Sequence, residues 1–316
     1  MTNEPVVHTR RAAIGAGLAA LAAAPAVARQ ATRSWQRGAS PWPLCLDTAT
    51  IRPASLEDKV RIAAETGFDA IEPWDGELAE YERNGGHLAD LGKKIRDRGL
   101  FVPSVIGLWD AIPPTREAWD AGLPATRNRL RMAAAIGSQH VQVIPGPPRE
   151  AKDFDAKWAA DRYRDLLEIG LGEFGVNPAM VFVAFLPGAR RFGQAAAIAL
   201  DADHPKAKII PDVFHMHIGG SGFSGLKHVR GSLIAIFQFN DAPATPSIEK
   251  LEDKHRVYPG DGILPLGECL RDLRASGFDG CVSLELYNEE YWKQDLKTVA
   301  ETGKRKSLEV IAKAFA

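Results

Sequence analysis

Three short stretches of the chain each end an apolar run in polar side chains: residues 211–215 (PDVFH), 237–241 (FQFND) and 282–286 (VSLEL). Where strands and helices alternate, polar side chains at strand ends gather on one rim, and the active sites of eight-stranded α/β barrels lie there. Asp212 and Glu285 supply carboxylates that could bind a metal ion or accept a proton. We therefore expect these two acids, although far apart in the sequence, to converge on one site.

Other predicted strand ends add polar side chains to this rim. Carboxylate, imidazole and amide groups suit Mn²⁺, Mg²⁺ or Zn²⁺, ions that polarise the carbonyl and hydroxyl groups of a substrate. The same groups could instead hold sugar hydroxyls directly, cap strand ends or pack in loops. Trp74 could stack on a sugar ring, and Lys293 could contact a hydroxyl or phosphate group. The polar candidates are Asp47, Glu72, Asp75, His140, Gln142, Asp212, His215, Gln238, Asp241 and Glu285.

The elements that would position these side chains are short apolar runs that alternate with amphipathic segments from about residue 42 onward. This pattern is typical of βα units in a parallel sheet. Gly67, Gly99, Gly137 and Gly277 fall where helices would end before the next strand. Eight strands closed into a barrel leave no strand edge unpaired. The sequence therefore predicts an α/β fold, a single-domain (β/α)8 TIM barrel over residues 42–316. The predicted strands are residues 44–48, 70–73, 102–106, 140–144, 180–185, 208–212, 234–240 and 282–286.

The first residues have the features of an export signal. Arg10 and Arg11 precede an alanine-rich apolar run, and residues 26–28 (AVA) offer small side chains for a signal peptidase. Paired arginines are required in a twin-arginine signal. A membrane anchor is the alternative, but a membrane span needs about 20 apolar residues and this run is shorter. We predict a twin-arginine export signal at residues 1–28, a flexible linker at 29–41, and a periplasmic or secreted protein that has no membrane attachment after cleavage.

The composition and net charge of the chain limit the classes of molecule that it can be expected to bind. The chain has 316 residues, of which 45% are hydrophobic, and a net charge of −1, so no bulk charge attracts it to nucleic acid or to an anionic membrane. Its three cysteines lack the spacing of a metal site or a disulfide framework. A Gly-x-Ser-x-Gly nucleophile motif is also missing. A small-molecule carbohydrate is the expected partner, and the sequence leaves the oligomeric state open, a homo-oligomer included.

Four segments resemble the xylose-isomerase-like TIM barrels, the AP endonuclease 2 superfamily. They are residues 45–52 (CLDTATIR), 70–74 (AIEPW), 256–262 (RVYPGDG) and 284–295 (LELYNEEYWKQD). That family includes sugar isomerases and epimerases, inosose dehydratases and metal-dependent apurinic endonucleases. The likeness covers nearly the whole chain after the signal and is closest to a bacterial subgroup labelled sugar phosphate isomerase/epimerase.

The resemblance implies one divalent metal, held by a Glu after the fifth strand, an Asp after the sixth, a His on the seventh and a Glu after the eighth. Asp212 and Glu285 match two of these positions. Ala184 stands where the first Glu would be, and Gln238 stands where the His would be. The implied metal set is therefore Asp212, Gln238 and Glu285. The loss of one anionic ligand should lower metal affinity, so a weakened metal site and a site with no cofactor are both open.

Ala184 also bears on the reaction, because the family's isomerases and epimerases resemble enzymes that use two glutamate bases, and a methyl group cannot carry a proton. Three explanations stay open. The chain could bind metal through a rearranged set that recruits Asp47, His215 or water. It could use Glu285 as a single base on an acidic carbon. It could also bind sugars without converting them.

Taken together, the strand ends and the resemblance predict an isomerase or epimerase for a sugar or an oxidised sugar derivative. A lyase that acts on a keto-sugar or keto-glycoside through one base is the first alternative, and a non-catalytic carbohydrate-binding protein is the second, so the question of enzyme activity stays open. We predict Glu285 and His215 as catalytic residues. The predicted substrate contacts are Asp47, Glu72, Trp74, His140, Gln142, Asp241, Arg256 and Lys293.

Overall fold

Eight parallel strands form two four-stranded sheets, in the orders β2-β1-β8-β7 and β3-β4-β5-β6. Isolated parallel bridges join the sheets on both sides: Trp74 pairs with Ile106, and Asp212 pairs with Gln238. The strands therefore close into a ring, as predicted for a (β/α)8 barrel. The strands are β1 (Leu44–Asp47), β2 (Ala70–Glu72), β3 (Ser104–Ile112), β4 (His140–Pro145), β5 (Asn177–Val181), β6 (Ile209–Ile210), β7 (Ile236–Phe239) and β8 (Cys281–Leu284).

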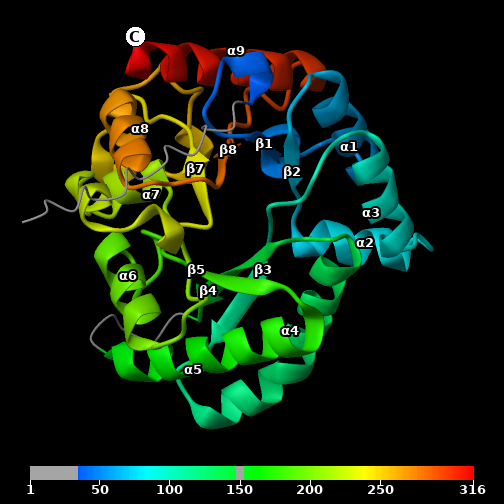
Figure 1. Cartoon of the computed structure of the whole chain (residues 1–316), viewed down its shortest axis with the longest axis vertical. Coiled ribbons are helices and arrows are strands. Elements are labelled where there is room, and N and C mark those ends of the chain that lie inside the picture. Colours follow the sequence, from blue (N-terminus) through cyan, green and yellow to red (C-terminus); the bar gives the residue numbers. More distant parts are fainter. Residues whose placement is uncertain (1–34, 147–152) are drawn as a thin grey trace, which may run out of the picture. The chain divides into compact units, whose positions relative to one another are not determined.

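The helices surround this ring (Figure 1). Ser55, Thr115 and Asp155 cap helix N-termini by accepting backbone N–H groups. Gly137 and Gly277, each just after a helix, have φ values near +80°, a conformation that favours glycine. The helices are α1 (Leu56–Glu65), α2 (Asp75–Arg83), α3 (Leu88–Asp97), α4 (Arg116–Ala135), α5 (Ala156–Ile169), α6 (Phe192–Asp201), α7 (Val213–Ile218), α8 (Leu266–Ala275) and α9 (Leu296–Phe315), with short helical turns η1 (Gln36–Gly38), η2 (Thr48–Ile51), η4 (Gly170–Phe174), η5 (Ser224–His228), η6 (Gly231–Leu233), η7 (Ile248–Lys250) and η8 (Asp253–His255).

The computed structural model describes residues 35–146 and 153–316. The predicted export signal, residues 1–28, lies outside these residues, and in the described part no helix is long and apolar enough to span a membrane. The described end of the predicted linker contacts the barrel. Trp35 packs on Phe101 with ring centroids 6.1 Å apart, and Gln36 donates to a carboxylate oxygen of Asp69 at 2.6 Å. These contacts attach the segment to the barrel.

Two strands depart from the sequence prediction. β3 continues to Ile112 through two register shifts, whereas β5 lies earlier than predicted and ends at Val181. The apolar run continues past Val181, but Val183 donates its N–H to the Ala189 carbonyl at 3.1 Å, which turns the chain away from the sheet. Ala184 therefore lies in the loop after β5.

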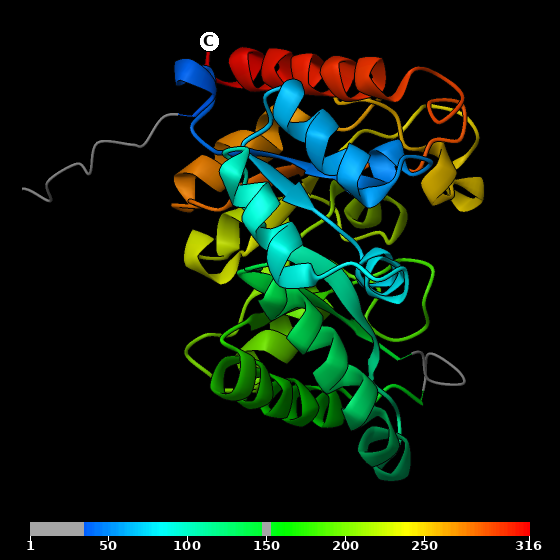
Figure 2. The same cartoon turned by 90° about the vertical axis from the view of Figure 1, so that its right-hand side faces the viewer.

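Alternate strand residues face opposite sides. Leu44 and Leu46 pack in the large core shared with the helices, whereas Cys45 and Cys281 belong to a second cluster, inside the ring. The three cysteines are buried thiols, the third being Cys269 in α8, as expected for small apolar side chains. Because Asp47 follows the alternation of Cys45, its carboxylate faces the interior at the carboxyl end of the strands. Figure 2 shows the helices along the outside of the ring from a second direction.

Candidate functional site

Asp212 and Glu285 lie at neighbouring strand ends on the same rim of the barrel. Asp212 follows β6 and caps α7, because its Oδ1 accepts the N–H groups of Phe214 at 2.7 Å and His215 at 3.4 Å. Glu285 follows β8, and its N–H bonds to the Phe239 carbonyl of β7. The bridge between Asp212 and Gln238 joins the same strand ends. The two acids therefore belong to one site.

Arg256 lies between the two carboxylates. Its Nη1 donates to Asp212 Oδ2 at 2.7 Å and to Glu285 Oε2 at 2.8 Å. Nε and Nη2 both donate to Asp253 Oδ1, at 2.9 and 2.6 Å, and Nη2 lies 3.3 Å from Nε2 of His215. The side chain is 1% exposed. Every N–H of the guanidinium therefore has a protein partner in this arrangement, and the predicted substrate contact of Arg256 stays a prediction.

His215, predicted as catalytic, contacts the guanidinium rather than standing free. Because arginine only donates, Nε2 of His215 accepts and Nδ1 carries the ring hydrogen. That Nδ1 is buried and has no hydrogen-bond partner among the described residues. Burial lowers the pKa of His215, with a smaller opposing effect from Asp212. The ring therefore sits beside the guanidinium as an acceptor.

The loop that carries Arg256 is held by Asp241. Its carboxylate accepts the backbone N–H groups of Gly260 at 3.0 Å, Gly262 at 3.1 Å and Leu264 at 2.9 Å. A Cβ on Gly262 would lie 2.2 Å from the Ala242 carbonyl oxygen, so this loop requires glycine there. Both oxygens of Asp241, a predicted substrate contact, accept backbone N–H groups in this structure. Asp241 is a positioning residue.

A second pair of buried acids lies beside the first. Glu72 accepts from Gln142 Nε2 at 2.8 Å and from Ser283 Oγ at 2.7 Å. Burial raises the pKa of Glu72 to about 7, although these hydrogen bonds oppose the shift. Asp47 accepts the Ala49 N–H at 2.7 Å through Oδ1, while its Oδ2 is buried without a partner among the described residues. Burial and the charge of Glu72 raise the pKa of Asp47 as well.

Asp212 and Glu285 share one guanidinium, yet their pKa values move in opposite directions. Burial opposes ionisation of Asp212, but Arg256 and His215 outweigh it and lower its pKa to about 2. Burial raises the pKa of Glu285 well above its ordinary value, and Arg256 only partly offsets this. The neighbouring charges explain the difference. Arg256 and His215 favour the ionised form of Asp212, whereas the charges of Asp47, Asp212 and Glu72 disfavour the ionised form of Glu285. Glu285 accepts from Arg256 and from Tyr287 Oη at 2.8 Å.

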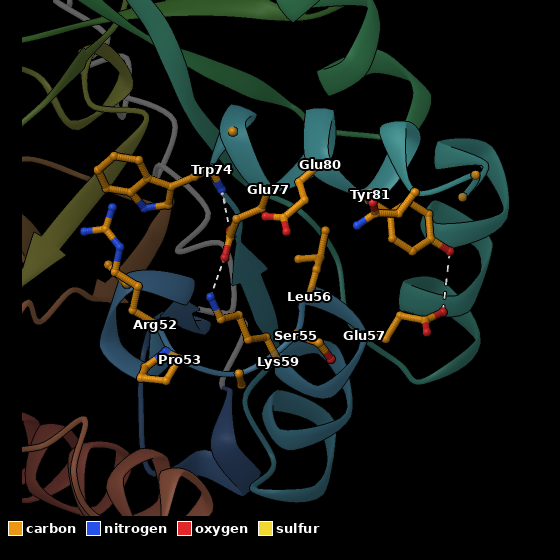
Figure 3. A pocket seen from close by; sticks show the side chains of 16 residues that line it. Arg52, Pro53, Ser55, Leu56, Glu57, Lys59, Trp74, Glu77, Glu80 and Tyr81 are labelled. Carbon is orange, nitrogen blue, oxygen red and sulfur yellow. Dashed lines mark hydrogen bonds and ion pairs between the residues drawn. The ribbon is translucent and has the colours of Figure 1, made fainter.

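Aromatic rings form one wall beside these acids. Trp74 stacks on Trp109 with centroids 5.5 Å apart and meets Tyr287 edge-on at 5.9 Å. The guanidinium of Arg52 lies 5.4 Å from the Trp74 ring. Trp74 and Arg52 also line one end of a groove of about 910 Å³ between α1 and α2 (Figure 3). The wall therefore continues from the strand ends to an open surface.

Two other predicted substrate contacts are His140 and Lys293. His140 is the first residue of β4, at the amino end, and its Nδ1 is 2.9 Å from the Pro103 carbonyl oxygen. Burial lowers its pKa to about 4, so the ring is neutral. His140 therefore lies at the opposite end of the strands from the rim site. Lys293, in the loop after β8, is exposed and pairs with Glu290. The predicted residues that lie in or beside the site are Asp47, Glu72, Trp74, Gln142, Asp212, His215, Gln238, Arg256 and Glu285.

Sequence reasoning missed Tyr287 and Asp253. Tyr287 stands two positions after Glu285, and its hydroxyl reaches that carboxylate. The spacing offered a signal, because side chains two apart on an extended segment share a face. Asp253 gave no comparable signal, since its role depends on the path of the loop that brings Arg256 into the site.

The donor set does not fit a divalent cation. Ala184 has no ligand atom, and its methyl group would lie 3.3 Å from a Cβ built on Gly219. The two acidic ligands that the resemblance implies, Asp212 and Glu285, are bound to a guanidinium. Within residues 35–146 and 153–316, no group of three or more His, Cys, Asp or Glu side chains is arranged to hold a metal ion.

Known proteins resemble this chain over most of its length. It is 32% identical over 278 residues to an inosose isomerase of Halalkalibacterium halodurans, covering 86% of this chain and 97% of that protein. It is 24% identical to a 3-dehydroshikimate dehydratase of Pseudomonas putida, over 80% of this chain and 39% of that protein. The crystal structure of the IOLI protein with a bound zinc atom superposes with a TM-score of 0.80 at 25% identity, covering 87% of this chain and 99% of that one. The profile of one family matches residues 60–313. The chain belongs to the xylose isomerase-like TIM barrel family.

Proposed function

We propose that this chain is an isomerase that moves a ketone around a ring-shaped polyol or sugar derivative by proton transfer. Two relatives, an inosose isomerase and a 3-dehydroshikimate dehydratase, are named for reactions of ring compounds that carry a ketone. Isomerisation and dehydration of such compounds both begin when a base removes a proton from the carbon beside the carbonyl. The observation that carries the proposal is a strand-end carboxylate, Glu285, fixed by Arg256 and Tyr287.

Glu285 is the proposed base. It is 3% exposed, and burial together with the charges of Asp47 and Asp212 raises its pKa. A carboxylate with a raised pKa accepts a proton more readily than one in water. Asp212 cannot replace it, because two backbone N–H groups and Arg256 stabilise its ionised form.

A single base limits the reaction to one face of the substrate ring. Glu285 would take the proton from a carbon beside the ketone and return it to the former carbonyl carbon, while a proton passes between the two oxygens. Epimerisation instead needs proton donors on both faces, and Ala184 removes the second carboxylate that the resemblance implies. The isomerase part of the predicted function is therefore favoured over the epimerase part.

A lyase is the second candidate, since it uses the same first step. Once the proton is on Glu285, a leaving group on the next carbon could depart instead of the proton returning. The dehydratase among the relatives supports this course. In both reactions the Trp74 and Trp109 wall would hold the apolar face of the ring.

Exchange of solvent deuterium tests the proposal. Purified protein is incubated in D₂O with inososes and other ring ketones, and NMR follows the carbon beside the ketone. We expect deuterium at that carbon, with the ketone shifted for an isomerase or an unsaturated ketone formed for a lyase. Glu285→Gln should slow exchange by about 10³-fold, within the range for a general base. Binding of these ketones without any exchange would contradict the proposal and favour the carbohydrate-binding alternative.

We also propose that the chain is exported through the twin-arginine route. The paired Arg10 and Arg11 before an alanine-rich run support this. Cell fractionation should find the shortened protein outside the cytoplasm. Changing both arginines to lysine should leave the full-length form inside, and export of that variant at the normal level would contradict the proposal.

A further inference from the structure

We propose that the guanidinium of Arg256 takes the place of the divalent cation that the family resemblance implies, so that this chain works without a bound metal. The inference deepens the proposed function, and it rests on that function for what the cation does in the reaction. The position of the cation rests on geometry alone. One nitrogen of Arg256 contacts both Asp212 and Glu285, at 2.7 and 2.8 Å.

The guanidinium is held from every side. Its carbon lies 5.0 Å from the ring centroids of both Phe214 and Tyr287, and its edge is bound by Asp253. A guanidinium keeps its charge at any pH that proteins meet. The centre therefore contains a permanent positive charge in a fixed orientation, which is what a structural metal ion would supply.

The charges around Arg256 make an acid at position 184 unfavourable. Asp212, Glu285 and Asp253 already pair with its single positive charge. The ligand set that the resemblance implies places three carboxylates around a doubly charged ion. A guanidinium carries half that charge, so a further carboxylate in place of Ala184 would add repulsion without a partner.

The replacement has a chemical consequence. Because its donors are saturated by protein groups, Arg256 does not coordinate the substrate as a metal would. It is a positioning residue for Glu285, and its fixed charge stabilises the negative charge that develops on the substrate oxygen when the proton leaves. This arrangement suits a substrate whose carbon is already acidified by a ketone.

Metal binding by the unmodified full chain is the first test, and it needs no substrate. After dialysis against a chelator, thermal unfolding is measured with and without Mn²⁺ or Zn²⁺. A bound ion at a thousand times its Kd would raise the ratio of folded to unfolded protein about a thousandfold, so we expect no such shift. One equivalent of a divalent ion in the purified protein, whose removal lowers the melting temperature, would overturn the inference.

Variants provide the second test. Arg256→Ala combined with Ala184→Glu and Gln238→His should gain ion-dependent stabilisation, because removing a charge beside two carboxylates changes cation affinity by more than about a hundredfold. Adding Asp212→Asn should abolish that gain. Arg127→Ala, which breaks an exposed pair with Glu173, is the matched control and should gain nothing. Equal ion binding by the unmodified chain and the triple variant would contradict the inference.

Deuterium exchange provides the third test and separates the two proposals. Exchange by the unmodified chain should resist EDTA, and Arg256→Ala should recover exchange with methylguanidinium but not with Mn²⁺. Exchange that is lost in EDTA would overturn the metal-free centre while leaving the proposed reaction intact. If no ketone exchanges and no ion stabilises the fold, the proposed function fails and the assignment of Arg256 as the resident cation stands. The measurements on the unmodified chain hold even if a variant fails to fold.

Discussion

Two buried cations in this barrel are bound to carboxylates, and they differ in what surrounds them. Lys59 in α1 is 2% exposed and pairs with Glu77 in the first turn of α2 (Figure 3). Glu77 also accepts from Thr48 Oγ1 at 2.6 Å and from the Trp74 N–H at 3.0 Å. Arg256 instead joins carboxylates from two strand ends. Lys59 connects neighbouring elements, whereas Arg256 is enclosed by more acids than it can neutralise.

The difference shows that burial of an ion pair is not by itself a mark of function. A buried pair costs desolvation energy that its attraction only partly returns. Lys59 pairs with a single carboxylate, that of Glu77, whose side chain is 21% exposed. Around Arg256 lie two further buried acids, Asp47 and Glu72, whose pKa values burial raises. A cluster of buried acids with shifted pKa values at strand ends is the stronger indication of a reactive site.

The largest expected effect is that of Arg256→Met. Removal of the guanidinium leaves Asp212 and Glu285 buried without their partner, and a broken buried pair costs about 3–5 kcal/mol. Urea unfolding should show this loss, and exchange of substrate deuterium should fall with it. If Arg256→Met is as stable as the unmodified chain, Arg256 and Lys59 do not differ in the way described above.

The pH dependence of the free energy of unfolding tests whether Glu72 is protonated in the fold. Its folded-state pKa is about 7 against an ordinary 4.5, so the folded protein keeps a proton that the unfolded chain loses. Stability from this group is full below pH 4.5 and falls as the pH rises to about 7, by up to about 3 kcal/mol at 1.36 kcal/mol per unit. Glu72→Gln should remove this fall in unfolding curves measured from pH 4 to 8. An unchanged slope would mean that Glu72 is ionised in the fold.

Asp241→Asn tests how the chain places its arginine. The Gly260 and Gly262 N–H groups bond to Oδ2 and the Leu264 N–H to Oδ1. An amide keeps one of these oxygens and places its NH2 at the other, which leaves a buried donor unsatisfied at a cost of about 1–3 kcal/mol. Exchange activity should fall more than ketone binding, because Glu285 loses its fixed orientation. If activity and stability are both unchanged, the loop does not depend on Asp241.

The smallest effect is expected for Lys59→Met. The methionine keeps the buried stem, and Glu77 retains its contacts with Thr48 and the Trp74 N–H. We expect a loss of about 1–2 kcal/mol in urea unfolding, less than for a fully buried pair. Exchange activity should stay within about twofold, since the ammonium does not reach the strand-end acids. A loss of activity equal to that of Arg256→Met would remove the distinction between the two cations.

Sequence patterns predicted the barrel because strand length, alternation and helix-ending glycines act locally. They also predicted the rim position of Asp212 and Glu285, which follows from parallel strands ending on one side. His140 shows the limit of this reasoning. The alternation of polar and apolar residues predicts the face of the strand on which a side chain lies, but it does not predict whether the residue lies at the amino or the carboxyl end. The role of Arg256 was beyond sequence reasoning. Its place depends on a loop held by Asp241, and no local pattern specifies that path.

The guanidinium of Arg256, whose N–H groups all have protein partners, also affects how the active protein forms. A metalloenzyme must capture its ion from the surroundings, and competing ions can occupy the vacancy first. Here the positive charge belongs to the side chain of Arg256. It is in place as soon as the loop after β7 has folded over the strand ends. Folding and activation are then a single event, independent of which ions the compartment provides.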